Sequence, residues 1–217
     1  IPIFAAVTRA VPALPPTQGG QAEVSPVVAR LQPAVFPDTP LGLEGLNTIY
    51  LSSERALDLK ESQVKALLAW LRAGGRLVLG VEQLGHLNGT DWLKPLLPCE
   101  VTGLGLASPH DALQEWLTKP LPSGRLMPLV VRHAHVPGMR FDPRGGQPEV
   151  SGDNPYANLK PDTSFANAPM QVASARLREG RVLIGSEAQP LAVSARRGRG
   201  ELVTLLFSPE LEPFLSW

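Results

Sequence analysis

The sequence predicts an α/β fold with a largely parallel central sheet, and three observations support this prediction. Two short runs of aliphatic and β-branched residues, TIYL from Thr48 and RLVL from Arg76, have the composition of buried parallel strands. An amphipathic segment lies between them. A pair of glycines, Gly74 and Gly75, follows that segment. This order of strand, helix and strand is typical of a right-handed β-α-β unit.

The chain begins with a predicted strand followed by a loop. Residues 1–7, IPIFAAV, form an apolar run of strand length. Residues 10–21, AVPALPPTQGGQ, contain three prolines and a Gly-Gly pair. Proline removes hydrogen-bond donors and Gly-Gly loosens the chain, which excludes a helix or a central strand. We therefore expect a loop after the first strand.

The strongest local signal is helical. In LKESQVKALLAWLRAGG, four apolar side chains recur at i, i+3, i+4 and i+7, namely Val64, Leu67, Leu68 and Leu71. Burial of four such side chains contributes roughly 6–12 kcal/mol, at about 1.5–3 kcal/mol each. Gly74 and Gly75 supply the left-handed conformation that ends a helix. We expect this unit to form the centre of the fold.

The carboxyl-terminal half is predicted to add one helix and several strands. SPHDALQEWL is expected to be a short helix capped by Ser108 or Asp111. Five segments have strand patterns: RLMPLVVRHAHV, PMQVASARL, EGRVLIGS, PLAVSARR and GELVTLLFS. A Gly-rich hairpin turn joins the last two, so we expect extra antiparallel strands in this half. The region at about 137–169 shows neither period and is predicted to be a long irregular loop.

Composition limits the functional classes. The length of 217 residues suits one α/β domain, so we expect a single domain over residues 1–217. Lys plus Arg and Asp plus Glu each total 20, so the chain lacks the charge excess expected of a protein that binds nucleic acid or anionic lipid. No apolar run approaches the roughly 20 residues that span a bilayer. The chain begins with Ile1 rather than Met, so we expect either a processed product or, in preference, a piece of a longer protein.

Cysteine and histidine offer little for metal or cofactor chemistry. Cys99 is the single cysteine, follows a proline in an apolar context, and is expected to pack as a small hydrophobe. His133 and His135 would share one face of a strand, but the sequence places no third ligand beside them. The basic stretch ARRGRGEL is flanked by two strands, which favours an exposed hairpin over a phosphate site. We therefore expect no metal and no cofactor.

Three segments resemble the glutamine amidotransferase-like domains that occur as soluble parts of bacterial membrane proteins. They are residues 46–80, residues 92–103 and residues 190–217. The resemblance covers most of the chain from about Pro33 and consists of glycine, proline and strand patterns. It implies a flavodoxin-like, three-layer sandwich. It also implies an envelope-associated protein, on the periplasmic side, with a membrane tether outside this chain.

The resemblance also allows a test for activity. Class I glutamine amidotransferases carry a cysteine in a G-x-C-x-G-H turn after a strand, and an H-P-E motif after a late strand. The matching stretches here are GVEQLGH, with Glu82 at the cysteine, and FSPE, with Ser208 at the histidine and Glu210 retained. GVEQLGH also has one residue more between its glycines. Amide hydrolysis through a thioester needs the thiolate and its base, and loss of such groups costs on the order of 10^6 in turnover.

Two functional hypotheses follow. In the first, the chain is a non-catalytic module that binds a protein partner or a small ligand at the former active site, with Glu82 and His86 as candidate ligand-binding residues. In the second, Glu82 and Glu210 act as a carboxylate pair in a hydrolase. A pocket holding both carboxylates favours the enzyme, and carboxylates splayed in solvent favour the module.

Each of these residues also has a purely structural alternative. Glu82 could cap a strand end in solvent, His86 could be ordinary surface, and the segment from Ser208 to Glu210 could simply begin a turn. If the resemblance is sound, Glu82 follows the RLVL strand and the turn from Ser208 to Glu210 approaches it from a neighbouring strand end.

Overall fold

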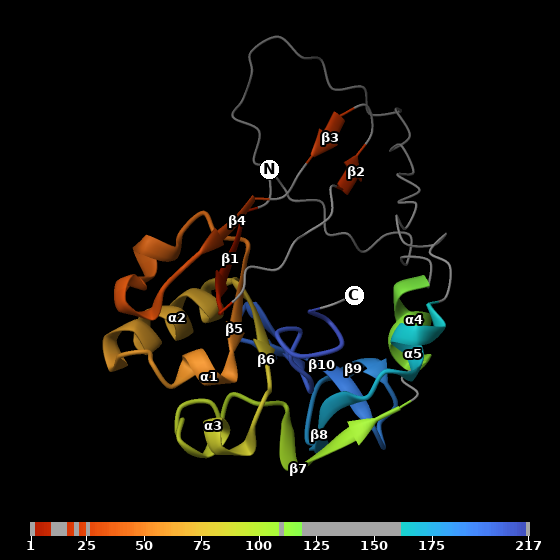
Figure 1. Cartoon of the computed structure of the whole chain (residues 1–217). Helices are drawn as coiled ribbons and strands as arrows, with labels where there is room; N and C mark the ends of the chain where they lie inside the picture. Colours follow the sequence, from red (N-terminus) through yellow and green to blue (C-terminus); the bar gives the residue numbers. More distant parts are fainter. Residues whose placement is uncertain are drawn as a thin grey trace, which may run out of the picture.

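A seven-stranded sheet organises the protein (Figure 1). The computed structural model describes residues 3–9, 17–19, 22–24, 27–108, 111–118 and 162–215. In spatial order the strands are β4 (Val27–Arg30), β1 (Ile3–Val7), β5 (Thr48–Ser52), β6 (Arg76–Gly80), β11 (Gly200–Leu205), β10 (Pro190–Arg197) and β9 (Arg181–Gly185). The first five are parallel, whereas β10 and β9 are antiparallel to their neighbours. The expected largely parallel sheet with antiparallel additions is confirmed.

The predicted β-α-β unit lies at the centre of the sheet. Strands β5 and β6 are parallel neighbours, paired from Thr48 with Arg76 to Ser52 with Gly80. Helix α2 (Glu61–Ala73) connects them and ends at Gly74, whose φ of 133° lies in the region that glycine tolerates best. Of the predicted apolar stripe, Val64, Leu67 and Leu71 are buried. The fourth residue, Leu68, is half-buried and packs against the core. The helical prediction is confirmed.

Two hydrophobic clusters stabilise the fold. The larger one joins α2 to the parallel strands and includes Ile49, Leu51, Leu67, Leu71, Leu77, Leu79 and Leu202. The smaller one lies where α4 (Asp111–Thr118) and α5 (Thr163–Asn167) meet β9 and β10, and includes Leu113, Phe165, Met170, Ile184, Ala192 and Phe207. Cys99 is buried in the larger cluster, as expected for a packed hydrophobe.

The order of the strands reverses between β1 and β5. From β1 the chain reaches the edge strand β4, then returns across β1 to β5 and continues outward to β6. Two short 3-10 helices, η1 (Pro33–Val35) and η2 (Pro40–Leu43), and the short helix α1 (Ser53–Ala56) lie in these connections. Because all these strands are parallel, their carboxyl ends share one edge of the sheet. In open α/β sheets, ligands bind outside the carboxyl ends at such a reversal.

The structure corrects the prediction of a loop at residues 10–21. Strands β2 (Thr17–Gly19) and β3 (Ala22–Val24) pair as a small antiparallel hairpin. Proline and glycine do exclude a helix or a central strand there, but a hairpin of three-residue strands needs only local hydrogen bonds between proline-free segments. The remaining residues of the expected loop lie outside the described ranges.

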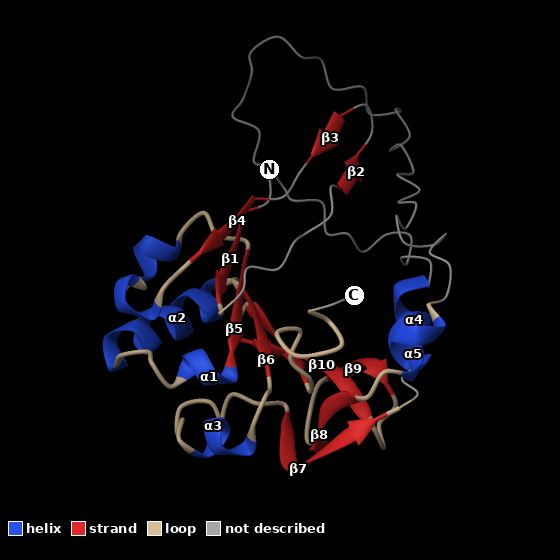
Figure 2. Ribbon diagram, in the orientation of Figure 1, coloured by secondary structure: helices blue, strands red, loops and turns tan. Residues whose placement is uncertain are grey.

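The carboxyl-terminal half also departs from the prediction in two places (Figure 2). Strand β7 (Cys99–Ala107) was not predicted, because Gly103 and Gly105 interrupt its apolar pattern. It pairs with β8 (Met170–Leu177) in a separate two-stranded sheet. Helix α5 lies inside the region predicted to be irregular, and its first turn is capped by Asp162, which accepts hydrogen bonds from two backbone N–H groups. Helix α4 begins at Asp111, one of its two predicted caps. The predicted strand at residues 125–136, with its two histidines, lies outside the described residues.

Candidate functional site

Polar side chains follow the carboxyl ends of four neighbouring parallel strands. They are Arg9 after β1, Ser53 and Glu54 after β5, Glu82 after β6, and Ser208 and Glu210 after β11. We call this set the edge cluster. Strands β1, β5, β6 and β11 are adjacent in the sheet, so residues from four separate parts of the chain meet here. The predicted approach of the Ser208–Glu210 turn to Glu82 is confirmed by a direct hydrogen bond between Ser208 and Glu82.

Glu82 lies at the centre of the edge cluster and is only 3% exposed. Its Oε1 atom accepts a hydrogen bond from Ser208 Oγ at 3.0 Å and one from Arg9 Nη2, also at 3.0 Å. A buried carboxylate needs such partners, because desolvation of an unpaired charge is costly. Of the two alternatives for Glu82, an exposed carboxylate is therefore excluded.

Arg9 is the cation of the edge cluster and contacts three carboxylates. Besides Glu82, its Nε atom lies 3.1 Å from Glu54 Oε2 and 3.5 Å from Glu210 Oε2. Its backbone N–H donates to the same Glu210 oxygen at 2.9 Å. Partial burial opposes the charged form of Arg9, but the negative charges of the three glutamates outweigh it and raise the pKa of Arg9. Arg30 holds the backbone in place by donating from Nη2 to the Arg9 carbonyl oxygen at 2.8 Å.

The turn after β6 is fixed through its backbone. The N–H of Glu82 donates to Ser53 Oγ at 3.0 Å, and its carbonyl oxygen accepts from Gln171 Nε2 at 2.6 Å. Ser53 Oγ also lies 3.2 Å from Nδ1 of His86, the histidine of helix α3 (Leu84–Asn88). His86 therefore supports the turn through Ser53. Because the Glu82 N–H is already bonded, it is not free to stabilise an oxyanion in this arrangement.

Ser208 serves two roles. Its hydroxyl donates to Glu82 and accepts from the backbone N–H of Glu210 at 3.1 Å. The second contact closes a local turn of the kind that serine commonly forms. The structural alternative for this segment is thus correct as far as it goes, and Ser208 is in addition a member of the edge cluster.

Tyr50 adds a buried hydroxyl beside the edge cluster. Among the described residues, its Oη atom and the Glu210 Oε1 atom make no hydrogen bond of ordinary geometry, although Ser208 and Glu210 lie close enough to Tyr50 to affect its pKa. Burial, with the nearby charge of Glu210, raises the pKa of Tyr50. Gly80 makes room for this side chain, since a Cβ atom at position 80 would lie 2.5 Å from Tyr50 Oη. Unpartnered buried polar atoms are rare in folded proteins and often mark sites of functional interest.

Sequence inspection identified Glu82, Ser208 and Glu210 but missed Arg9 and Ser53. A usable signal was present, because each missed residue lies two positions after a predicted strand, and the carboxyl ends of parallel strands share an edge. No sequence signal indicated that Tyr50 would lie beside Gly80 or that Gln171 would donate to the Glu82 carbonyl oxygen. These contacts depend on which strands are neighbours and on the position of the separate β7–β8 sheet.

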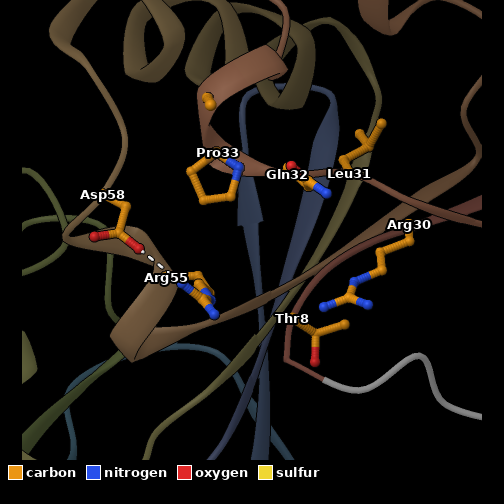
Figure 3. A pocket seen from close by; sticks show the side chains of 8 residues that line it. Thr8, Arg30, Leu31, Gln32, Pro33, Arg55 and Asp58 are labelled. Atoms are coloured by element: carbon orange, nitrogen blue, oxygen red, sulfur yellow. Dashed lines mark hydrogen bonds and ion pairs between the residues drawn. The ribbon is translucent and has the colours of Figure 1, made fainter.

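A cavity of about 440 Å³ lies beside the edge cluster (Figure 3). Its lining residues come from the ends of β1 and β4, from η1 and from α1 and the residues after it: Thr8, Arg30, Leu31, Gln32, Pro33, Ala34, Arg55 and Asp58. Neither Glu82 nor Glu210 lines this cavity. It is therefore not the pocket holding both carboxylates that a carboxylate-pair enzyme calls for.

The residues that the structure describes hold no group of three or more His, Cys, Asp or Glu side chains arranged to bind a metal ion. No helix among these residues has both the length and the apolar character needed to cross a membrane.

Comparisons with known proteins give similarity at the level of the fold. No family model matches the sequence, and no curated protein matches it. Among solved structures, cytoplasmic protein STM1381 from Salmonella typhimurium LT2 has a TM-score of 0.54 and 12% identity, covering 100% of this chain and 94% of that one. Cytoplasmic protein STM3548 from Salmonella typhimurium has a TM-score of 0.53 and 11% identity, covering 100% and 93%.

A glycosidase is also similar over a smaller part of its length. The exo-β-1,4-mannosidase Op5Man5 from Opitutaceae bacterium strain TAV5 has a TM-score of 0.45 and 14% identity, covering 88% of this chain. This chain spans 25% of the length of that enzyme. At such identities the likenesses to the Salmonella proteins indicate a shared fold and nothing about function. The resemblance to amidotransferase-like domains stays a prediction.

Proposed function

We propose that the chain is a catalytically silent amidotransferase-like module that binds or scaffolds a partner. One observation carries the proposal. Glu82, at the position of the amidotransferase cysteine, is buried and its Oε1 atom is occupied by Arg9 and Ser208. A carboxylate held in this way faces protein donors rather than a substrate.

The other two catalytic positions support the same proposal. In place of the histidine base stands Ser208, whose hydroxyl donates to Glu82 and is engaged in a turn. The retained Glu210, which in the parent family orients the base, here accepts from the Arg9 backbone. Glu82, Ser208 and Glu210, at the places of the nucleophile, its base and the orienting group, instead join the cluster that contains Arg9. A thiol nucleophile and its base are both missing, and acyl transfer through a thioester needs both.

The finer fold class and the cellular setting belong to the proposal. A flavodoxin-like, three-layer sandwich is supported by the parallel strand order, by the reversal between β1 and β5, and by the packing of α2 on the parallel strands. Association with the bacterial envelope on the periplasmic side, with a membrane tether outside this chain, is supported by the resemblance alone. A protein partner or a small ligand is the expected binding target.

The carboxylate-pair hydrolase is the second candidate. It is favoured by two buried polar atoms beside the edge cluster, Glu210 Oε1 and Tyr50 Oη, that make no hydrogen bond of ordinary geometry among the described residues. Against it, Glu82 and Glu210 share the Arg9 cation, and the neighbouring cavity holds neither of them. These contacts favour the silent module.

The release of ammonia from glutamine tests the central proposal. We expect the purified chain to release no more ammonia than a heat-denatured control. We also expect no efficient enzyme from Glu82→Cys combined with Ser208→His. The turn has one residue more than the family pattern, its N–H is bonded to Ser53, and a misplacement of about 1 Å can cost roughly 10^2 in rate. Turnover by the wild-type chain above the control would refute the silent module.

A panel of chromogenic esters, amides and glycosides separates the two candidates. Wild type, Glu82→Gln and Glu61→Gln are compared, because Glu61 is an exposed surface glutamate of α2 and provides a matched control. The silent module predicts no turnover by any of the three. Turnover by wild type and Glu61→Gln that is lost in Glu82→Gln would establish the hydrolase.

A further inference from the structure

The cavity beside the edge cluster has two arginines in its wall. Arg30 and Arg55 lie on opposite sides of Thr8, with the Arg55 guanidinium also in contact with Asp58 (Figure 3). The chain has no net charge, so this positive pair is a local feature. Two arginines that line one cavity suit carboxylate and phosphate groups, which arginine binds in bidentate fashion.

The position of the cavity favours a ligand site. Thr8 follows β1, Arg30 ends β4, and Arg55 belongs to α1, directly after β5. The cavity therefore lies outside the carboxyl ends of the three strands around which the strand order reverses. This crevice is the usual ligand position in open α/β sheets.

Both arginines retain donors for a ligand. Arg30 gives one N–H of Nη2 to the Arg9 carbonyl oxygen at 2.8 Å. Arg55 Nη1 pairs with Asp58 Oδ2 at 3.1 Å, and that carboxylate is 49% exposed. A guanidinium group has five N–H donors, so these contacts leave several uncommitted within the part of the chain that the structure describes. Asp58 competes with an incoming anion for Arg55.

The size of the cavity favours an organic anion over a small inorganic ion as its ligand. Its volume of about 440 Å³ lies within the roughly 300–1,000 Å³ range of small-molecule pockets. Leu31, Pro33 and Ala34 provide an apolar wall next to the arginines. We propose that this cavity binds a small organic anion whose phosphate or carboxylate groups contact Arg30 and Arg55. The inference rests on the proposed binding role and names the ligand class for it.

Isothermal titration calorimetry with three probes tests the inference. Citrate represents polycarboxylates, glucose 6-phosphate represents phosphate esters, and glucose is the uncharged control. We expect saturable binding of citrate, of glucose 6-phosphate or of both, none of glucose, and weaker binding at higher salt. The probe that binds identifies the anionic group that the cavity prefers.

Four variants connect binding to the cavity. Arg30→Gln and Arg55→Gln should each weaken binding at least about 10-fold, because each removes a charge-assisted hydrogen bond. Asp58→Asn should tighten binding, since it removes the competing carboxylate. Arg76→Gln is the matched control because Arg76 is 56% exposed at the amino end of β6. It should bind like the wild type.

Asp58→Asn keeps the test decisive if an arginine variant fails to fold, because the expected gain in affinity cannot come from misfolding. The inference is overturned if neither anion binds up to about 10 mM, or if Arg30→Gln, Arg55→Gln and Arg76→Gln all bind alike. Either result leaves the proposed silent module intact, because that proposal is judged by ammonia release. Conversely, glutaminase activity with unchanged anion binding would overturn the silent module alone.

Discussion

Substitution of Arg9 by Gln is the sharpest probe of the edge cluster. The variant removes the cation that contacts Glu54, Glu82 and Glu210 and leaves a shorter, uncharged polar side chain. Two of these carboxylates are almost fully buried, with side chains that are 4% exposed for Glu82 and 5% exposed for Glu210. Without Arg9 both stay buried and lose their counter-charge. The folded state therefore loses stability relative to the unfolded chain, in which the carboxylates are hydrated.

The size of the effect follows from the distances. At 3.0–3.5 Å and an effective dielectric constant of about 20, each contact has a gross attraction of about 5 kcal/mol, which desolvation largely offsets. Removal of one partner from a buried ion pair typically costs about 3–5 kcal/mol. The Arg9 side chain is 42% exposed, so water screens these contacts. We therefore expect a loss of about 2–3 kcal/mol in the free energy of unfolding.

Urea unfolding at neutral pH measures this loss. Arg76→Gln is the control, because Arg76 forms a more exposed ion pair with Glu201 and such pairs contribute about 0–1 kcal/mol. The double variant Arg9→Gln with Glu82→Gln should recover part of the loss, because it removes one of the stranded charges. If Arg9→Gln costs no more than Arg76→Gln, the carboxylates do not depend on Arg9 and our account of the cluster is wrong.

Three further predictions concern side chains outside the Arg9 contacts. Tyr50→Phe should change the unfolding free energy by less than about 1 kcal/mol, because the hydroxyl makes no hydrogen bond of ordinary geometry among the described residues. Gly80→Ala should cost about 1–3 kcal/mol by overpacking against Tyr50, and Tyr50→Phe should partly rescue it; equal costs of Gly80→Ala in both backgrounds would contradict this. Burial raises the pKa of Cys99 to about 11, so a disulfide reagent at about pH 8 should label the native chain negligibly and the unfolded chain at one thiol. Despite partial burial, the hydroxyl of Ser194 and a neighbouring arginine lower the pKa of Glu201 below its ordinary 4.5. Its stabilising contribution is therefore present above pH 4.5 and is lost as the pH falls through the lowered pKa. Thermal unfolding measured from neutral to acidic pH should show that Glu201→Gln loses less stability on acidification than the wild type.

Local sequence signals were sufficient for the central elements. The 3.6-residue period at Val64, Leu67 and Leu71, followed by Gly74, determines helix α2 and its end. Short aliphatic runs predict β5 and β6 as parallel strands, neighbouring or next-neighbouring, and the structure places them side by side. The approach of Ser208 to Glu82 was expected from the resemblance to the amidotransferase family, which puts the two segments at neighbouring strand ends. Strand β7 was not predicted, because glycines interrupt its pattern.

The composition of the edge cluster was decided by the tertiary structure. Arg9 and Glu210 are 201 residues apart in sequence, and Arg9 and Glu82 are 73 apart. Their contact requires β1, β5, β6 and β11 to lie side by side, an order that no local period encodes. The burial of Glu82 has the same origin, since an isolated GVEQLGH turn is compatible with either a solvated or a buried carboxylate. Periodicity and turn chemistry act over a few residues, so the sequence alone determined the elements and the kinds of side chain at their ends. Only the packing of distant strands determined which charges meet, and that packing joins the buried carboxylate of Glu82 to Arg9 and Ser208.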